Sequence, residues 1–197
     1  AGKGVELLQQ AGIEVVIPLM QEAAKDLVKG HVSRHTKQRP FVRLKLAMTL
    51  DGKTALSNGE SRWITSPESR ADVQKLRASS AAIVTGVQTV IDDDPRLSVR
   101  SEELMIEHAQ LCAAVERPVY ILDSGLRVPE TVQLMSVPST VVVTTSDRDA
   151  HLPVEVLRIS ALENRVDIKV LLEELAAREH SEVLVECGPT LAGSLIS

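Results

Sequence analysis

The chain has 197 residues, 44% of them hydrophobic and 25% charged, which suits one domain with a well-buried core and a small attached piece. Its formal net charge of −5 gives no basic footprint for nucleic acid, although a local cluster of arginines could still hold a phosphate. Aromatic residues make up 2% of the chain, which argues against a stacking platform for single-stranded bases and favours aliphatic strands covered by helices.

The first 38 residues are predicted to be separate from the rest of the chain. Residues 4–10 and 21–29 have helical patterns, residues 13–18 are a β-branched run, and residues 31–39 are polar and basic without a period. A segment of this size cannot bury a core of its own. We therefore place a boundary near Gln38 and interpret residues 1–38 as an appendage or as the tail of a missing domain.

Beyond this boundary, predicted strands alternate with predicted helices. The strands are at 41–49, 81–85, 119–122, 140–144 and 182–186, the helices are at 67–78, 102–115 and 166–178, and a further helix opens at 188–190. Ser66 and Asp167 are the candidate N-caps of two of these helices. The alternation predicts an α/β fold with a mainly parallel central sheet flanked by helices and with ligands at the carboxyl ends of its strands.

Basic and apolar residues alternate along the first of these strands. Arg43, Lys45 and Ala47 share one face. A lysine inside a central strand is costly unless it meets an anion or a ligand, and Ala47 leaves room for a flat group near the backbone. The alternative is an edge strand whose basic face is solvated.

The only tryptophan of the chain stands in a polar loop ahead of a helix. Trp63 could cover a planar ligand and Ser61 could donate to a phosphate or a hydroxyl group; the alternative is an indole that fills the edge of the core. In the next helix, Arg70 and Arg77 lie on one face. Arg77 either binds a phosphate with its planar fork or satisfies the terminal carbonyls of the helix, and both interpretations stay open.

Three aspartates, residues 92–94, follow the strand that ends at Gly86. Thr89 is expected in the loop between them. The aspartates either form a capped, solvated loop before Pro95 or present one carboxylate to ligand hydroxyls or ring nitrogens. A divalent metal is not favoured, because no histidine accompanies the carboxylates and their spacing fits no common ligand frame.

A glycine-rich junction, residues 186–193, follows the last predicted strand. Such a strand-to-helix turn directs backbone N–H groups and the positive helix end toward an anion, typically a phosphate. Glu186 places a carboxylate beside the same crevice. The junction is not the Gly-x-Gly-x-x-Gly fingerprint, and neither a Walker motif nor a Gly-x-Ser-x-Gly elbow occurs in the chain.

Together, these motifs resemble the reductase half of the bifunctional riboflavin-biosynthesis deaminase/reductase. The resemblance covers residues 39–197 and depends on four motifs in the right order, at 39–55, 59–65, 89–95 and 186–193. It implies a dihydrofolate-reductase-like fold. It also implies NADPH-dependent reduction of 5-amino-6-(5-phosphoribosylamino)uracil, with hydride transfer to C1 of the ribose.

The resemblance also implies roles for individual residues. The residues expected to contact NADPH are Ala47, Trp63, Thr89, Asp93, Ser124, Gly188, Pro189, Thr190, Leu191, Ala192, Gly193 and Ser194. Those expected to contact the substrate are Ser61, Arg77, Leu97, Arg100 and Glu186, with the two arginines directed to its phosphate. Lys45 and Asp93 are the candidate catalytic residues, which would polarise or protonate the reacting group. A further expectation is that arginine or lysine side chains near the loops at Ser124 or at residues 145–148 select the extra phosphate of the cofactor, with Arg148 as the named candidate.

The resemblance sets expectations for the domains, cofactors and partners as well. Residues 1–38 would be the tail of the deaminase domain, and residues 39–197 a reductase domain truncated at its C-terminus. The zinc signature of the deaminase, His-x-Glu with Pro-Cys-x-x-Cys, is absent, so zinc and deamination belong to the missing domain and no metal site is expected here. We expect a small phosphorylated pyrimidine as substrate, no nucleic-acid or membrane partner, and a homo-oligomer, a dimer or larger.

Two cysteines, Cys112 and Cys187, are too few and too poorly spaced for a zinc site or a disulfide framework. Reduced cysteines fit a cytoplasmic protein, and no apolar run reaches the length of a membrane span. Two functional alternatives remain at this point: a related reductase acting on another pyrimidine or pterin, and a nucleotide-binding module without catalysis. A purely structural role would leave Lys45, Trp63 and residues 92–94 unexplained.

Overall fold

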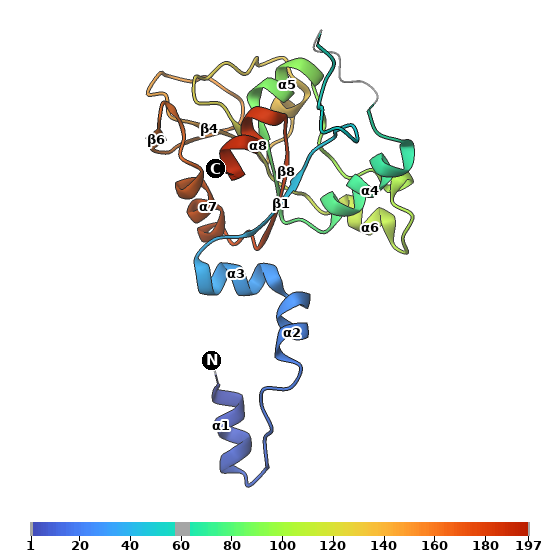
Figure 1. Ribbon diagram of the computed structural model, residues 1–197. Helices are drawn as coiled ribbons and strands as arrows, with labels where there is room; N and C mark the ends of the chain where they lie inside the picture. The colour runs from blue at the N-terminus through green and yellow to red at the C-terminus, as the bar shows by residue number, and fades with distance from the viewer. Residues whose placement is uncertain (1, 58–63, 197) are drawn as a thin grey trace.

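Six parallel strands form the central sheet of the computed structural model, which describes residues 2–57 and 64–196 (Figure 1). From one edge to the other, their order is β1 (Phe41–Lys45), β8 (Glu182–Glu186), β2 (Ala82–Gly86), β3 (Val119–Leu122), β4 (Thr140–Thr144) and β5 (Glu155–Arg158). Every neighbouring pair in this sheet is parallel. The expected α/β fold with a mainly parallel sheet is confirmed.

The strands at the centre of the sheet are apolar on both sides because helices cover both faces. On one face, the side chains of alternate strand residues pack against α7 (Ile168–Ala177) and α8 (Pro189–Ile196). On the other face, they pack against α5 (Val87–Asp93) and the 3-10 turn η2 (Gln133–Ser136). The core is therefore two mainly aliphatic layers, as the low aromatic content predicted, with Tyr120 as the aromatic side chain of one layer.

The predicted capping residues cap the N-termini of two helices. The Ser66 side chain accepts a hydrogen bond of 3.3 Å from the backbone N–H of Ser69 at the start of α4 (Pro67–Ala78). The Asp167 carboxylate accepts one of 2.9 Å from the N–H of Lys169 at the start of α7. Both predictions are confirmed. An N-cap acts on the first turn of the helix that it begins, so local sequence is enough to predict it.

Several expected elements differ from the structure. The helix expected at 102–115 is interrupted, with η1 (Ser101–Glu103) and α6 (Ala109–Ala114) at its ends, because Leu104 turns into the core and His108 takes a left-handed conformation. The strand expected at 41–49 ends at Lys45, opposite the last residue of β8. The loop expected around Thr89 is helix α5. Strand β5 and the hairpin of β6 (Ala161–Leu162) and β7 (Arg165–Val166) were not predicted.

Residues 2–38 form an arm that projects away from the sheet (Figure 1). It contains α1 (Lys3–Gln10), α2 (Gln21–Leu27) and α3 (Lys29–Lys37). Residues 13–18 form no strand, and helix α3 replaces the aperiodic segment expected at 31–39. Neither α1 nor α2 contains a buried residue. No helix within residues 2–57 and 64–196 has both the length and the hydropathy of a membrane span.

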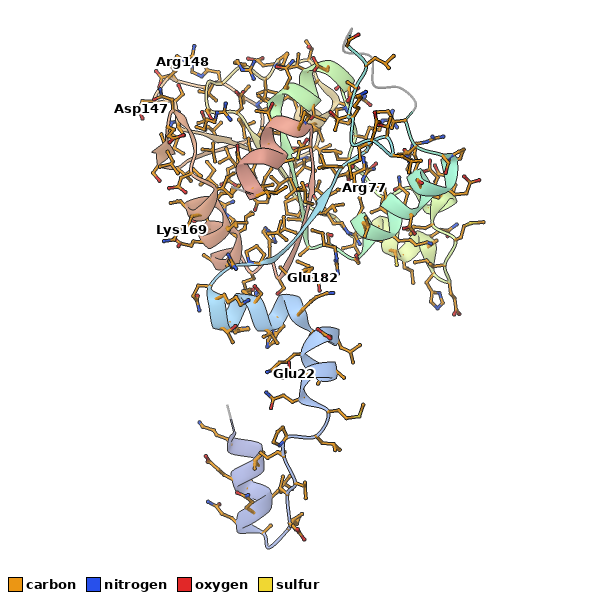
Figure 2. All side chains as sticks on the ribbon, viewed as in Figure 1. Glu22, Arg77, Asp147, Arg148, Lys169 and Glu182 are labelled. Carbon is orange, nitrogen blue, oxygen red and sulfur yellow. The ribbon has the colours of Figure 1, made fainter. Side chains whose placement is uncertain are left out.

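Helix α3 lies against the amino end of the sheet, near Glu182 (Figure 2). Gly30 is buried there, and a Cβ atom at this position would lie 2.3 Å from Cγ of Glu182. The Arg34 guanidinium donates a hydrogen bond of 2.8 Å to the carbonyl of Glu179. The arm is thus attached to the domain through one closely packed helix.

Candidate active site

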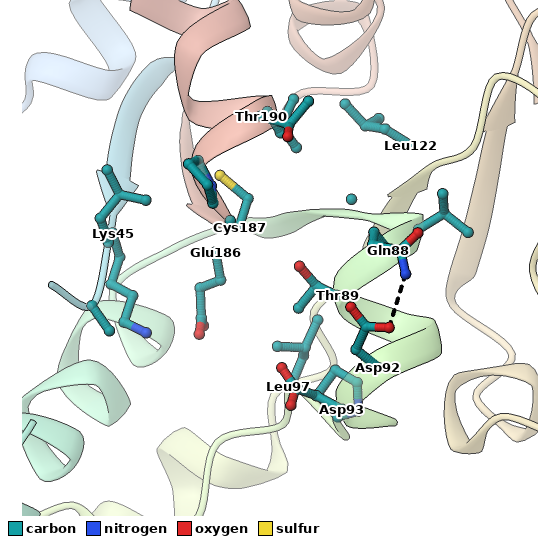
Figure 3. A pocket seen from close by; sticks show the side chains of 18 of the residues that line it. Lys45, Gln88, Thr89, Asp92, Asp93, Leu97, Leu122, Glu186, Cys187 and Thr190 are labelled. Carbon is teal, nitrogen blue, oxygen red and sulfur yellow. Dashed lines mark hydrogen bonds between the residues drawn. The ribbon is translucent and has the colours of Figure 1, made fainter. Parts of the chain in front are cut away.

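A large open pocket of about 1580 Å³ lies at the carboxyl ends of β1, β8, β2 and β3 (Figure 3). Its walls come from the segments that follow these strands, at residues 45–47, 86–89, 122–125 and 186–191. Parallel strands that end at the same edge bring such segments together, so residues far apart in the sequence share one site.

Most of the predicted site residues that the structure describes line this pocket. They are Lys45, Ala47, Arg77, Thr89, Asp93, Leu97, Arg100, Ser124, Glu186, Gly188, Pro189, Thr190, Leu191 and Ser194. Ala192 and Gly193 do not line it, and Ala192 is buried instead. The predicted residues Ser61 and Trp63 lie outside the described residues.

Lys45 is the last residue of β1, and its register partner is Glu186 at the end of β8. Figure 3 shows both side chains entering the pocket from these neighbouring strands. Strand β1 lies at an edge of the described sheet, as the alternative interpretation proposed, so Lys45 is not in a central strand. Its ammonium group nevertheless lines the pocket and has no hydrogen-bond or ion-pair partner among the described residues. It is available to a ligand.

Arg43, on the same face of β1, is already occupied. Its guanidinium forms an ion pair of 2.6 Å with Glu182 and lies over the ring of Phe41. Of the two basic residues that this face of β1 carries, only Lys45 lines the pocket. On this face of β1, Arg43 is held in an ion pair within the protein and Lys45 is available to a ligand.

Arg77 and Glu186 form a mostly buried ion pair across the pocket floor. Nε and Nη2 of Arg77 donate to the two carboxylate oxygens at 2.6 and 2.9 Å, and the side chains are 13% and 8% exposed. Nη1 of Arg77 donates to the carbonyl of Ser98 at 2.9 Å. The guanidinium therefore orients the carboxylate, as charge-assisted bidentate pairs do. Within residues 2–57 and 64–196, the Arg77 side chain makes no hydrogen bond to the terminal carbonyls of its own helix.

Arg100 is the more accessible of the two arginines expected to meet a phosphate. Its side chain is 50% exposed, and its guanidinium is 3.0 Å from Glu103 in an ion pair that solvent can screen. Its backbone N–H donates to the buried Gln74 side chain at 3.0 Å, which fixes the position of the main chain at the pocket rim. Arg100 can thus bind an anion without breaking a buried contact.

The three aspartates have separate environments at the end of α5. Asp94 has a left-handed backbone, and its carboxylate accepts from the N–H and the side-chain amide of Gln133 at 2.8 and 3.2 Å. Asp92 accepts from Gln88 at 2.8 Å. Asp93 is exposed on the pocket wall. The capped-loop interpretation therefore fits Asp94, and the ligand-facing interpretation is compatible with the position of Asp93.

The glycine-rich junction leads from β8 into α8 at the centre of the pocket. The first turn of a helix leaves its N–H groups without acceptors in the helix, and these can bind a phosphate. A Cβ at Gly188 would meet no atom within 4 Å, so a ligand can approach the backbone there. Burial raises the pKa of Cys187 to about 11, so its thiol stays protonated at neutral pH.

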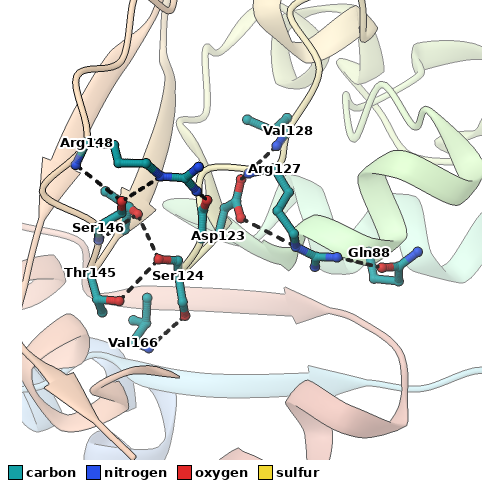
Figure 4. A network of polar contacts seen from close by, with 11 residues as sticks. Gln88, Asp123, Ser124, Arg127, Val128, Thr145, Ser146, Arg148 and Val166 are labelled. Carbon is teal, nitrogen blue, oxygen red and sulfur yellow. Dashed lines mark hydrogen bonds and ion pairs between the residues drawn. The ribbon is translucent and has the colours of Figure 1, made fainter. Parts of the chain in front are cut away.

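Polar contacts fix the loop that follows β3 (Figure 4). The Ser124 hydroxyl accepts from the N–H of Val166 at 3.1 Å, and the Ser124 carbonyl accepts from the Thr145 hydroxyl at 3.2 Å. The fully buried Asp123 carboxylate accepts from the N–H of Val128 at 2.8 Å. Ser124 is thereby held at the pocket wall, with its hydroxyl hydrogen available to a ligand.

Several lining residues were not predicted, among them Gln88, Gln133 and Arg165, whereas Arg127 is an arginine near Ser124, where one was expected. Arg165 belongs to the unpredicted β6–β7 hairpin, and no sequence signal places Gln133 beside Asp94, 39 positions away. Asp123 and Gly125 could have been added, because they directly follow a predicted strand together with Ser124.

The pocket is large enough for a long nucleotide cofactor. No group of three or more histidine, cysteine, aspartate or glutamate side chains that could hold a metal occurs among the described residues. A dinucleotide could place its diphosphate at the first turn of α8 and a flat ring beside Ala47. The volume leaves room for a second ligand near Lys45 and Glu186.

A family model described as the RibD C-terminal domain matches residues 40–197. The riboflavin biosynthesis protein RibD of Escherichia coli (strain K12) is 40% identical over 202 residues, which cover 100% of this chain and 55% of that protein. The chain therefore spans about half the length of the curated relatives it matches.

Two solved structures resemble the fold over nearly the whole chain. RibD of Acinetobacter baumannii is 39% identical with a TM-score of 0.84, and the match covers 100% of this chain and 53% of that one. The second is a diaminohydroxyphosphoribosylaminopyrimidine deaminase/5-amino-6-(5-phosphoribosylamino)uracil reductase of Thermotoga maritima. It is 31% identical with a TM-score of 0.77, covering 95% and 50% of the two chains. The dihydrofolate-reductase-like fold is confirmed.

Proposed function

Because the chain belongs to the RibD C-terminal domain family, we propose that its pocket reduces 5-amino-6-(5-phosphoribosylamino)uracil to the ribitylamino compound in riboflavin biosynthesis, with NADPH as cofactor. The name of the Thermotoga maritima relative includes this reductase activity. The observation that carries the proposal is that Lys45 and Glu186 are register neighbours at the carboxyl ends of β1 and β8 and share one pocket with the first turn of α8.

NADPH would supply a hydride to C1 of the substrate's opened ribose. The residues of the chain then have to position and polarise that carbon. Lys45 carries an available ammonium group that can donate a hydrogen bond or a proton to the reacting group. Asp93, on the opposite wall, is the second candidate for this role. Most of the acceleration would come from holding two ligands face to face.

Glu186 is suited to accept hydrogen bonds from the substrate's hydroxyl or ring N–H groups. Its carboxylate is 8% exposed and is oriented by both nitrogens of the Arg77 fork. A binding group held in this way loses little conformational entropy when the substrate arrives. Arg77 would thus act mainly by positioning Glu186, and we assign the main contact with the substrate phosphate to Arg100.

The related predictions belong to the same proposal. The substrate is a small phosphorylated pyrimidine, and the active form is a homo-oligomer located in the cytoplasm. Zinc and deamination are assigned to the deaminase half of the bifunctional enzyme, whose zinc signature does not occur in these 197 residues. The alternative of a nucleotide-binding module without catalysis predicts that the chain binds NADPH without oxidising it.

The test is turnover by the purified chain, measured as loss of NADPH absorbance when the phosphoribosylaminouracil is added. We expect Lys45→Met to lower kcat by about 100-fold or more, as loss of a group that acts on the reacting atoms does. The matched control is Lys75→Met, because Lys75 is exposed on α4, pairs with Asp72 and does not line the pocket. Binding of NADPH without turnover would refute the proposal and support the module.

A further inference from the structure

The end of the pocket beyond β3 carries two arginines that the proposed reaction does not use. Arg127 and Arg165 both line it, on the loop after β3 and on β7. The Arg127 side chain is 55% exposed, and its contacts are long, 4.0 Å to Asp123 and 3.3 Å to Gln88. Arg165 is exposed and has no hydrogen bond or ion pair with any residue in the described ranges.

The position of Arg165 is set by its neighbour in the hairpin. Val166 is buried, and its N–H donates to the Ser124 hydroxyl at 3.1 Å (Figure 4). This bond ties β7 to the loop after β3, so Arg165 and Arg127 are both next to residues fixed at the same pocket wall. Two guanidinium groups at one end of a pocket are suited to a phosphate monoester, whose charge and oxygens match their donors.

Arg148, the arginine named from the sequence, is occupied elsewhere. Its guanidinium donates to the Gly125 carbonyl and to the Ser146 hydroxyl, and it does not line this pocket. A ligand phosphate would have to break these contacts to reach it. The geometry therefore transfers the expected role from Arg148 to the two arginines inside the pocket.

The distance along the sheet indicates which ligand phosphate these two arginines would bind. Three strand spacings separate β1 from β3, or about 14 Å, with the first turn of α8 between them. In the proposed function, Lys45 at the end of β1 serves the substrate. A dinucleotide with its reactive ring beside Ala47 and its diphosphate at α8 would extend its adenosine half toward Ser124.

We propose that Arg165 and Arg127 bind the 2′-phosphate of NADPH and so select this cofactor over NADH. The proposal rests on the proposed function for the identity of the cofactor, and it extends that function by naming the residues that set cofactor preference. The same phosphate chemistry occurs in the substrate, which is the second source that the test must distinguish.

The first measurement is binding of NADP+ and NAD+ by titration calorimetry to the whole chain. The wild-type protein should bind NADP+ more tightly, and Arg165→Gln should weaken NADP+ binding by about tenfold, as expected for one charge-assisted contact, with less than about a twofold effect on NAD+. Arg127→Gln should act in the same direction. Arg148→Gln is the matched control and should change neither affinity.

The second measurement is steady-state kinetics with NADPH, NADH and the phosphoribosylaminouracil. Arg165→Gln should raise KM for NADPH and leave kcat and KM for the substrate unchanged. The inference would be overturned by any of four results: equal weakening of the binding of both cofactors, loss of the preference in Arg148→Gln, a wild-type protein without preference, or a raised KM for the substrate alone. Preferential NADP+ binding that Arg165→Gln abolishes, in a chain without turnover, would uphold the inference and refute the proposed function.

Discussion

Arg77 and Glu186 should depend on each other for stability, because each neutralises the other in a mostly buried position. The change Arg77→Met leaves the Glu186 carboxylate, 8% exposed, without its cation, and we expect a loss of about 3–5 kcal/mol in the free energy of unfolding. Glu186→Gln leaves the guanidinium without its carboxylate and should also destabilise the fold. The double variant removes both charges, so its cost should be smaller than the sum by about 2 kcal/mol.

The assay is urea unfolding followed by circular dichroism for the four members of this cycle. The matched control is the cycle of Lys75 and Asp72, an exposed pair 3.0 Å apart on the same helix, with side chains 52% and 67% exposed. Its coupling should stay below about 0.5 kcal/mol because solvent screens the charges. If the coupling of Arg77 and Glu186 is no larger than that of the control pair, Arg77 does not hold Glu186 and the assignment of its positioning role is wrong.

Three further predictions concern stability. Gly30→Ala should lower the free energy of unfolding by about 1–3 kcal/mol and detach the arm, because the added Cβ would overlap Glu182. Detachment would be seen as faster proteolysis of the arm. The control is Gly4→Ala, which is also in a helix but has open space around it and should not destabilise the protein. Burial lowers the pKa of His180 from 6.5, so the stability gained from its neutral imidazole is complete above that pH and is lost as the pH falls. His180→Gln should therefore flatten the dependence of the free energy of unfolding on pH between about pH 7 and pH 5, and an unchanged slope would contradict this. Asp167→Ala should lower the free energy of unfolding by about 1 kcal/mol through loss of the α7 cap, and a thermal melt identical to that of the parent would exclude a capping role.

The sequence predicted those parts of the fold whose cause is local. Strands β3, β4 and β8 were predicted with their observed bounds, since a short aliphatic run between turn residues has few other stable conformations. Helix α4 was predicted with both ends, since Ser66 and Pro67 act on the turn that they begin.

The candidate site was predictable as a set of segments. Parallel strands bring their carboxyl ends together, so residues at or after these ends, such as Glu186, Thr89 and Ser124, were expected to meet, and all three line the pocket. The roles that the family resemblance assigns to them stay predictions until a ligand is bound.

The tertiary structure decided the partners of the charged side chains and the elements that depend on distant contacts. Arg77 meets Glu186 across 109 positions, and nothing local to either residue indicates this pairing. Helix α5 forms where a loop was expected because the sheet buries Val87 and Val90, and burial outweighs weak helix propensity. The amino-acid sequence thus determined the strands, the caps and the edge of the sheet where polar groups collect. Which of these groups bind each other and which remain available to a ligand depends on packing, because ion pairs are chosen by distance in space and burial.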